Sequence, residues 1–348
     1  MITDILKKLD IDAIILADPC NIRYFSGFTG EGYIVITNNH KFVITDSRYL
    51  FVAQNELRDY GIKLTDNSSL VYIISKLITD FNIKKIGFEN LTCKYTFFAL
   101  LNNIKGVELI KLGSSIDDFR EIKSEKEIDL ITRAIKICDS VFNSVVKELR
   151  IGLSERDVAA YIDYQIRLNG ADGNSFDTIV ASGSNTTMPH AVPGDKRLAY
   201  GDFVIMDFGC KYKGYCSDMT RTVFIGNPTI DQIKIYNIVK EAKDKAEQEA
   251  TFGMTGKQID EIARNAIAAY GYSKEFMHGT GHGVGLYIHE KPFINKRNDN
   301  TVPIGSVFSI EPGIYIKDKF GIRIEDLCVM SNSGIKVLTS SDDSLICI

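Results

Sequence analysis

The chain has 348 residues, of which 45% are hydrophobic and 25% are charged, and these shares are typical of a folded protein and exclude a largely disordered one. Its 41 Lys and Arg residues are outnumbered by 45 Asp and Glu residues, so the formal net charge is −4 and we expect no nucleic-acid partner. The length predicts two domains, because single hydrophobic cores seldom grow beyond about 300 residues.

The first 119 residues alternate short apolar segments with amphipathic helical ones. The apolar run at Ala13–Ala17 is too short for a secretion signal or a membrane span, so we interpret it as a buried strand and expect a cytoplasmic protein with no membrane partner. The segments "GYIVIT" and "KFVITD", on either side of Asn38, Asn39 and His40, predict a β-hairpin. Residues 1–119 are therefore expected to form an α/β domain with a mixed sheet.

The seven cysteines do not predict a disulfide framework. They are odd in number and contain no C-x-x-C pair, so we expect reduced thiols. Cys210 and Cys216 flank a turn and could in principle pair, but buried free cysteines acting as small apolar side chains are favoured.

A second domain is predicted from residue 120 onward. Ser124 and Glu127 form the pattern of a capping box at the start of a long amphipathic helix, and Ser154 caps a second helix with Asp157. The same order of a long helix, a second helix and strands begins again at Thr229, which suggests an internal duplication.

Four carboxylates lie at the ends of predicted strands in this second domain. They are Asp207, Asp218, Glu311 and Glu325. Burying them together requires a counter-ion, because like charges repel and an unpaired buried carboxylate is costly. An oxygen-rich set with one histidine suits Mn, Co, Fe or Zn in a catalytic site, and two divalent cations would balance four carboxylates.

The segment "MHGTGHGVGLYIHE", residues 277–290, contains three of the five histidines. His278 and His282 have the spacing of a helical H-E-x-x-H zinc motif, but the Glu is missing and four glycines disfavour a helix. The glycines also fail the G-x-G-x-x-G pattern of dinucleotide loops. An extended backbone that another group approaches closely remains, so a bulky residue at Gly281 or Gly283 is expected to abolish activity.

Together, Asp207 and Asp218, "GTGHGVGL" with "IHE", "IEPG" and "RIED" resemble the ligand pattern of the pita-bread metallopeptidases, the creatinase and methionine aminopeptidase superfamily. "NIRYFSGFTG" and "TDSRY" are similar to the smaller domain of its aminopeptidase P and prolidase branch. The resemblance implies a creatinase-like α/β domain at residues 1–119. It also implies an α+β pita-bread catalytic domain with a pseudo-twofold antiparallel sheet at residues 120–348.

The resemblance also implies a role for each matching residue. Asp207 would be a bidentate ligand of one metal, Asp218 and Glu325 would bridge both metals, and His282 and Glu311 would complete the second. The two divalent ions would be Mn, with Co, Zn or Fe as alternatives.

The remaining matches lie at positions that the family uses for substrate and proton transfer. Glu311 would accept a proton from a water that bridges the metals and pass it to the leaving prolyl nitrogen. His190 and His289 would bind substrate and donate to oxygens that gain charge, and His278 would be a further pocket histidine. Arg323 matches an arginine that contacts either a ligand or the substrate carboxylate.

The activity implied by the resemblance is hydrolysis of the bond between an amino-terminal residue and proline, by a homodimer. A dipeptidase and an aminopeptidase acting on longer peptides share all these residues, so both remain open. A methionine-aminopeptidase-like enzyme and a non-catalytic pita-bread binding protein are the alternatives; the small domain speaks against the first and the intact ligand set against the second.

Overall fold

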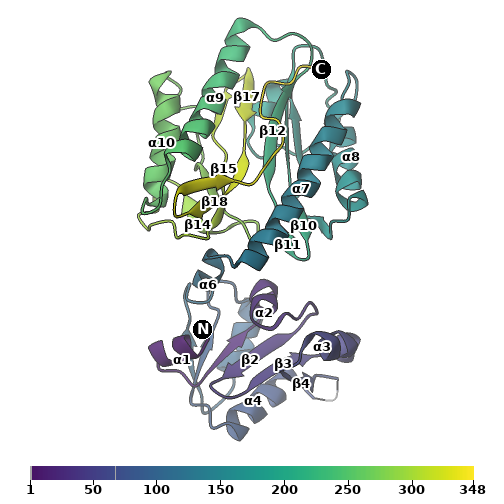
Figure 1. Cartoon of the computed structure of the whole chain (residues 1–348). Helices are drawn as coiled ribbons and strands as arrows, with labels where there is room; N and C mark the ends of the chain where they lie inside the picture. Colours follow the sequence, from purple (N-terminus) through teal and green to yellow (C-terminus); the bar gives the residue numbers. More distant parts are fainter. Residues whose placement is uncertain (1, 67) are drawn as a thin grey trace. The chain divides into compact units, whose positions relative to one another are not determined.

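The computed structural model describes residues 2–66 and 68–348, and the chain forms two compact units, residues 1–119 and 120–348 (Figure 1). Within the described part of the chain, none of the helices combines the length and the apolar character that a membrane span needs. All seven cysteines are free thiols.

The first unit contains a six-stranded mixed sheet in the order β4-β3-β2-β1-β5-β6. Strand β2 is antiparallel to both β1 and β3, and the remaining neighbours are parallel. The strands are β1 (Ala13–Leu16), β2 (Tyr33–Thr37), β3 (Lys41–Thr45), β4 (Gly61–Leu64), β5 (Lys85–Phe88) and β6 (Glu108–Lys111). The helices are α1 (Ile2–Lys8), α2 (Pro19–Ser26), the 3-10 turn η1 (Ser47–Tyr49), α3 (Leu50–Glu56), α4 (Leu70–Asp80) and α5 (Tyr95–Asn102). The predicted mixed sheet and the β2–β3 hairpin are confirmed.

Helices cover both faces of this sheet, which explains why β1 is apolar at every position. Side chains alternate between the faces of a strand. Ala13 and Ile15 belong to the core that contains α4 and α5, whereas Ile14 and Leu16 belong to the core that contains α1, α2 and α3. The short helices α1, α2 and α3 were not predicted from the sequence, because they are too short for a clear helical period.

The second unit contains two pairs of helices that begin in the same way. They are α7 (Glu125–Glu148), α8 (Glu155–Leu168), α9 (Ile230–Glu249) and α10 (Gly256–Ala269), and the short α6 (Asp118–Glu121) precedes them. Each of the four begins with a complete capping box, in which Ser or Thr and the residue three positions later satisfy each other's backbone donors. A long helix is followed by a helix of 14 residues in both pairs. The element order therefore repeats, as the sequence suggested.

Every strand pair in the second unit is antiparallel. The sheets are β11-β10-β7, β12-β9-β8, β14-β13-β15-β18-β19 and β16-β17. Their strands are β7 (Gly173–Asn174), β8 (Ile179–Ser182), β9 (Phe203–Phe208), β10 (Cys210–Tyr212), β11 (Tyr215–Cys216), β12 (Met219–Phe224), β13 (Gly281–Gly283), β14 (Glu290–Ile294), β15 (Val307–Ile310), β16 (Gly313–Ile316), β17 (Phe320–Arg323), β18 (Asp326–Ser331) and β19 (Gly334–Val337), with the 3-10 turn η2 at Gly183–Thr187. These antiparallel sheets confirm the predicted fold class.

The strands of the second unit lie between the two helix pairs (Figure 1). Helices α7 and α8 bury Phe142 and Ile162 against Val204 and other side chains of β8, β9 and β12. Helices α9 and α10 bury Val239 and Ile259 with side chains of β15, β16, β17 and β18. Two separate cores thus support the strands from opposite sides and leave polar side chains to meet between them.

One local expectation was wrong. Residues alternate in "GIRIEDLCV" so that a single strand would place Arg323 and Glu325 on one charged face and Ile322 and Ile324 on the other. Instead β17 ends at Arg323 and pairs with β16, whereas β18 begins at Asp326 and pairs with β15 and β19. Ile324 and Glu325 form the link between two sheets, and both are buried.

Candidate metal centre

Asp207 and Asp218 are brought together by the antiparallel pair β9–β12. Asp207 lies within β9 directly opposite Thr220, and Asp218 immediately precedes β12. The hairpin of β10 and β11 connects the two strands, which explains the ten residues between the aspartates. Both carboxylates are buried.

Glu311 and Glu325 are arranged in the same manner on the second pair, β15–β18. Ile310 is the last residue of β15 and lies opposite Asp326, the first residue of β18. Glu311 therefore follows one strand and Glu325 precedes the other, just as a carboxylate belongs to each strand of β9–β12.

Thr220 joins the two strand pairs. Its carbonyl oxygen accepts a hydrogen bond from the Glu325 backbone N–H at 3.1 Å, and its hydroxyl donates to Glu325 Oε2 at 2.8 Å. These two bonds fix the Glu325 carboxylate beside β12, the strand that Asp218 immediately precedes.

Carboxylate oxygens of Asp207, Asp218 and Glu325 lie within 4.8 Å of one another. Burial raises the pKa of Asp218 well above its usual value, and the charge of Glu325 adds to this effect. Burial and the charge of Glu311 likewise raise the pKa of Glu325, and burial raises the pKa of Glu311 to about 8. The protein alone therefore does not support four ionised carboxylates here.

The chemistry of this cluster fits a divalent cation. Asp207 Oδ1, Asp218 Oδ1 and Glu325 Oε1 are buried and have no hydrogen-bond partner among the described residues. One such oxygen belongs to each member of the cluster, so each of three carboxylates that lie together has an unsatisfied acceptor. Buried acceptors without donors are costly unless a metal ion or proton satisfies them.

His282 presents a ring nitrogen to the same place. Its Nε2 lies 3.6 Å from Asp218 Oδ2 and 3.4 Å from Glu311 Oε1. The Nδ1 atom is 3.2 Å from the Gly283 carbonyl oxygen, and a carbonyl can only accept, so we assign the proton to Nδ1 and a lone pair to Nε2. Burial lowers the pKa of His282 to about 4, and the charge of His289 adds to this effect, which keeps the ring neutral.

Arg323 is held by three partners at the edge of the cluster. Nη2 donates to Asp207 Oδ2 at 2.5 Å, Nη1 to the Tyr315 hydroxyl at 2.7 Å and Nε to Thr220 Oγ1 at 3.2 Å. Although burial opposes its charge, Tyr315 and the carboxylates of Asp207 and Glu311 hold the pKa of Arg323 well above its usual value. The guanidinium is almost fully buried, and its Nη2 atom bonds Asp207, so its charge acts on that carboxylate.

His278 is bound through the same tyrosine. Its Nε2 lies 2.9 Å from the Tyr315 hydroxyl, and its Nδ1 lies 2.8 Å from the Gly279 carbonyl oxygen. Burial, followed by the charge of Arg323, lowers the pKa of His278 to about 4. The ring is consequently a neutral group that faces the cavity.

All nine residues singled out in the sequence line one cavity of about 450 Å³. They are His190, Asp207, Asp218, His278, His282, His289, Glu311, Arg323 and Glu325. His190 and His289 are the exposed members, and the His289 ring lies edge-on to His282 with 4.3 Å between centroids. Partial burial of the ring, followed by the charge of His190, lowers the pKa of His289.

Sequence reasoning missed Thr220, Ser309 and Tyr315, which hold the cluster in place. Ser309 Oγ accepts from the His282 backbone N–H at 3.1 Å and donates to Glu311 Oε1 at 3.2 Å. Of the three, Ser309 alone had a signal in the sequence, as a polar residue inside the apolar run "VFSI". The apolar part of the cavity wall was also missed; it comprises Phe176, Ile179, Pro189, Ile288 and Phe293.

Two glycines of the histidine segment are approached closely by neighbouring strands. A Cβ at Gly281 would overlap the Ser309 carbonyl oxygen of β15, and one at Gly283 would overlap the Lys291 carbonyl oxygen of β14. The close approach at these two glycines is thus between the backbones of adjacent strands.

Comparisons with known proteins find matches to both units of the chain. The model of metallopeptidase family M24 matches residues 129–332, and that of the creatinase/prolidase N-terminal domain matches residues 2–122. The chain is 40% identical over 354 residues to an Xaa-Pro dipeptidase of Pyrococcus horikoshii, covering 99% of this chain and 97% of that protein.

Two solved structures show the same fold over almost the whole chain. An Xaa-Pro dipeptidase from Bacillus anthracis superposes with a TM-score of 0.96 at 36% identity, covering 99% of this chain and 97% of the other. An X-Pro aminopeptidase from Thermotoga maritima superposes with a TM-score of 0.93 at 37% identity, covering 98% and 99%. The chain therefore belongs to the metallopeptidase family M24, and it is a hydrolase whose first residues form a creatinase/prolidase N-terminal domain.

Proposed function

We propose that this protein hydrolyses the peptide bond between an amino-terminal residue and proline, with two divalent metal ions, most simply Mn²⁺. The observation that carries the proposal is that three buried carboxylates, Asp207, Asp218 and Glu325, lie together beside the lone pair of His282, and each has one unsatisfied oxygen. Relatives of matching length carry the names Xaa-Pro dipeptidase and X-Pro aminopeptidase, which supports this substrate class.

The contacts support a division of the ligands between two ions. His282 Nε2 lies near both Asp218 and Glu311, so these three side chains are suited to one ion. Asp207 would hold the other ion; Arg323 occupies one lone pair of its Oδ2 and leaves Oδ1 open. Asp218 and Glu325, each with an unsatisfied oxygen, would bridge the two.

Metal ions bound there would supply Lewis acidity, which polarises the scissile carbonyl and lowers the pKa of water toward neutrality. Glu311 lies at the cavity wall and would accept the proton of the attacking water and pass it to the departing prolyl nitrogen. His190 and His289 are exposed to the cavity and would donate to substrate oxygens as these gain charge. The apolar wall around Phe176 and Phe293 would exclude water from the scissile bond.

Of the two roles open to Arg323, its contacts favour the orientation of Asp207 over recognition of a substrate carboxylate. Each of its three nitrogens already donates within the protein, and the side chain is 3% exposed. His278 remains a candidate to contact substrate, because it lines the cavity beside Gly279.

The proposal also assigns a role to each of the two units. Residues 120–348 would be the catalytic domain, because the whole carboxylate cluster lies there, and residues 1–119 would be the creatinase-like domain. We further propose a homodimer in the cytoplasm, a compartment that suits seven free thiols.

Metal analysis followed by turnover of Ala-Pro and Ala-Pro-Ala tests the proposal. We expect turnover after reconstitution with Mn²⁺, and loss of it in Asp218→Ala and Glu311→Ala. Cleavage of the dipeptide alone would identify a dipeptidase, and cleavage of both an aminopeptidase. Activity retained in either variant would overturn the dinuclear mechanism. A chain that binds no metal would indicate a binding protein, and release of methionine without a following proline would indicate a methionine aminopeptidase.

A further inference from the structure

We propose that Arg221 is a positioning residue of this site: it fixes β12 and β18, the strands that follow Asp218 and Glu325, and ties both to the carboxy-terminal segment Thr339–Asp343. The inference rests on the proposed function, since its consequence is the spacing of two metal-bridging carboxylates. Arg221 lies three residues after Asp218 and does not line the cavity.

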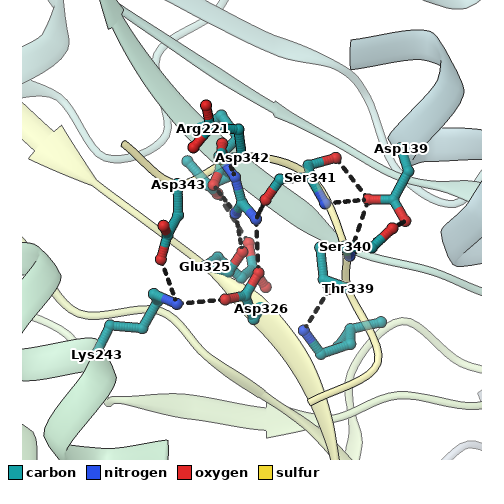
Figure 2. A network of polar contacts seen from close by, with 12 residues as sticks. Asp139, Arg221, Lys243, Glu325, Asp326, Thr339, Ser340, Ser341, Asp342 and Asp343 are labelled. Carbon is teal, nitrogen blue, oxygen red and sulfur yellow. Dashed lines mark hydrogen bonds and ion pairs between the residues drawn. The ribbon is translucent and has the colours of Figure 1, made fainter. Parts of the chain in front are cut away.

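The five N–H groups of Arg221 have five acceptors on three separate segments (Figure 2). Nη1 donates to the Thr220 carbonyl oxygen at 3.0 Å and to the Glu325 carbonyl oxygen. Nη2 donates to Asp326 Oδ1 at 2.7 Å and to the Ser341 carbonyl oxygen at 2.8 Å. Nε donates to the Asp342 carbonyl oxygen at 3.0 Å.

Two of these acceptors belong to the residues that set the carboxylate geometry. Thr220 contacts Glu325 directly, and Glu325 is one of the proposed bridging ligands. The strands β12 and β18 belong to different sheets, so no regular ladder fixes their separation. The planar guanidinium, which binds one carbonyl oxygen from each side, is a rigid spacer between them.

Asp326 extends this contact to α9. Its Oδ1 accepts from Arg221 Nη2, and its Oδ2 accepts from Lys243 Nζ. Lys243 is 2% exposed and also lies 3.0 Å from Asp343 Oδ2 in the carboxy-terminal segment. A lysine from the second helix pair therefore holds both the strand that follows Glu325 and the segment behind it (Figure 2).

Asp139 holds the same segment from α7, on the side of the first helix pair. Its carboxylate accepts from the Ser340 hydroxyl at 2.7 Å, the Ser341 hydroxyl at 2.5 Å and the Ser341 backbone N–H at 2.9 Å. The segment Thr339–Asp343 thus spans the space between α7 and α9 and supplies two of the carbonyl oxygens that orient Arg221 (Figure 2).

A purely structural role would not require this chemistry. Removing a buried charged network from water is costly, and well-packed apolar side chains often stabilise a core equally well. The hydrogen bonds of this network instead hold the backbone in place beside Asp218 and Glu325, the two carboxylates proposed to hold both ions. Groups behind metal ligands commonly change metal affinity by about 10- to 100-fold when they are altered.

Arg221→Lys tests this role, because lysine keeps the charge but has three donors and no planar fork. The intact chain is titrated with Mn²⁺ by calorimetry, well below the melting temperature of each variant, and kcat and KM for Ala-Pro are measured. We expect Mn²⁺ affinity about tenfold weaker or more. We also expect a lower kcat with little change in KM, because Arg221 does not line the cavity.

Lys243→Met and Lys240→Met form a matched pair that decides the question even if Arg221→Lys does not fold. Both lysines are on α9 and contact Asp244 and Asp343, but in the structure it is Lys243 that reaches Asp326. Lys243→Met should weaken Mn²⁺ binding and Lys240→Met should leave it unchanged. Ser340→Ala with Ser341→Ala, which keeps the backbone bonds to Asp139, replaces Lys243→Met in this comparison if that variant unfolds.

The outcomes separate the positioning role from the proposed function. Folded variants with a lower melting temperature but unchanged Mn²⁺ affinity and kcat would show that the network only stabilises the fold, and would overturn the inference. A wild-type chain that binds no Mn²⁺ would instead overturn the proposed function and the inference with it.

Discussion

At the scale of single residues, Gly283 shows how a position without a side chain controls the site. Gly283→Ala places a Cβ against the Lys291 carbonyl oxygen, so β13 must move away from β14 and carry His282 with it. We expect kcat/KM to fall by about 100-fold, the usual effect of misplacing a catalytic group by an ångström. Gly194→Ala is the control, because a Cβ there has room. Equal kcat/KM in both variants would refute this explanation.

The variant Tyr315→Phe tests the hydrogen bonds that the Tyr315 hydroxyl makes with Arg323 and His278. Tyr315→Phe removes the acceptor of Arg323 Nη1 and the partner of His278 Nε2, both of which are buried or half-buried. An unsatisfied buried donor costs about 1 to 3 kcal/mol, so the melting temperature should fall. Turnover should fall as well, since Arg323 also orients Asp207. Tyr200→Phe, at an exposed tyrosine, serves as the control; an identical response of the two variants would contradict the assigned contacts.

At the scale of elements, the capping box of α7 has a measurable effect. Ser124 accepts from the Glu127 backbone N–H, and the Glu127 side chain accepts from the Ser124 backbone N–H. Ser124→Ala removes one of these bonds, so the free energy of unfolding should fall by about 1 kcal/mol. Ser144→Ala, at a half-buried serine inside the same helix, makes the same change without touching the cap. Urea unfolding curves of the two variants should therefore differ, and coincident curves would contradict the prediction.

Elements with strong local signals could be predicted from the sequence, and elements shaped by long-range pairing could not. The capping patterns at Ser124 and Ser154 and the hairpin around Asn38 each depend on a few adjacent residues. The split of residues 320–331 between two sheets depends on which distant strand each half meets, and alternation within one strand contains no such information. Thr220 and Tyr315 were missed for the same reason, because their partners lie about 100 and 40 residues away in the chain.

The carboxylates themselves could be identified because each lies within or next to an apolar strand, where burial of an unpaired charge is costly. Asp207 and Glu311 are the clearest cases. The network around Arg221 could not be identified in that way, since its acceptors are mostly backbone carbonyl oxygens, which have no sequence signature.

At the scale of the whole molecule, the carboxylate cluster should make the stability of the metal-free protein depend on pH. A carboxyl group whose pKa is higher in the folded than in the unfolded protein stabilises the fold below its unfolded pKa, and this contribution is lost as pH rises through the folded pKa. Glu311, with a pKa of about 8 when folded, and Asp218 and Glu325 are of this kind. His278 and His282 act in the opposite direction, because burial lowers their pKa to about 4, but their effect is complete above pH 6.5.

Between pH 6.5 and 8 the carboxyl groups dominate this dependence. Glu89 and Glu247, outside the cluster, also titrate in this interval, because burial raises their pKa to about 7 and about 8, so a variant of Glu311 is needed to separate the cluster from them. Over this interval the metal-free protein should lose on the order of 1 to 2 kcal/mol of stability through Glu311 alone. Mn²⁺ at about 100 times its Kd should add about 2.7 kcal/mol and flatten the dependence, since bound cations keep the carboxylates ionised in the folded state. Melting temperatures measured against pH with and without Mn²⁺ test this. Glu311→Gln should reduce the slope of stability against pH in the metal-free protein. Glu261→Gln, at an exposed position of α10, should leave that slope unchanged. A metal-free protein that gains stability between pH 6.5 and 8 would show that burial does not raise the pKa values of the cluster carboxyl groups in the folded state.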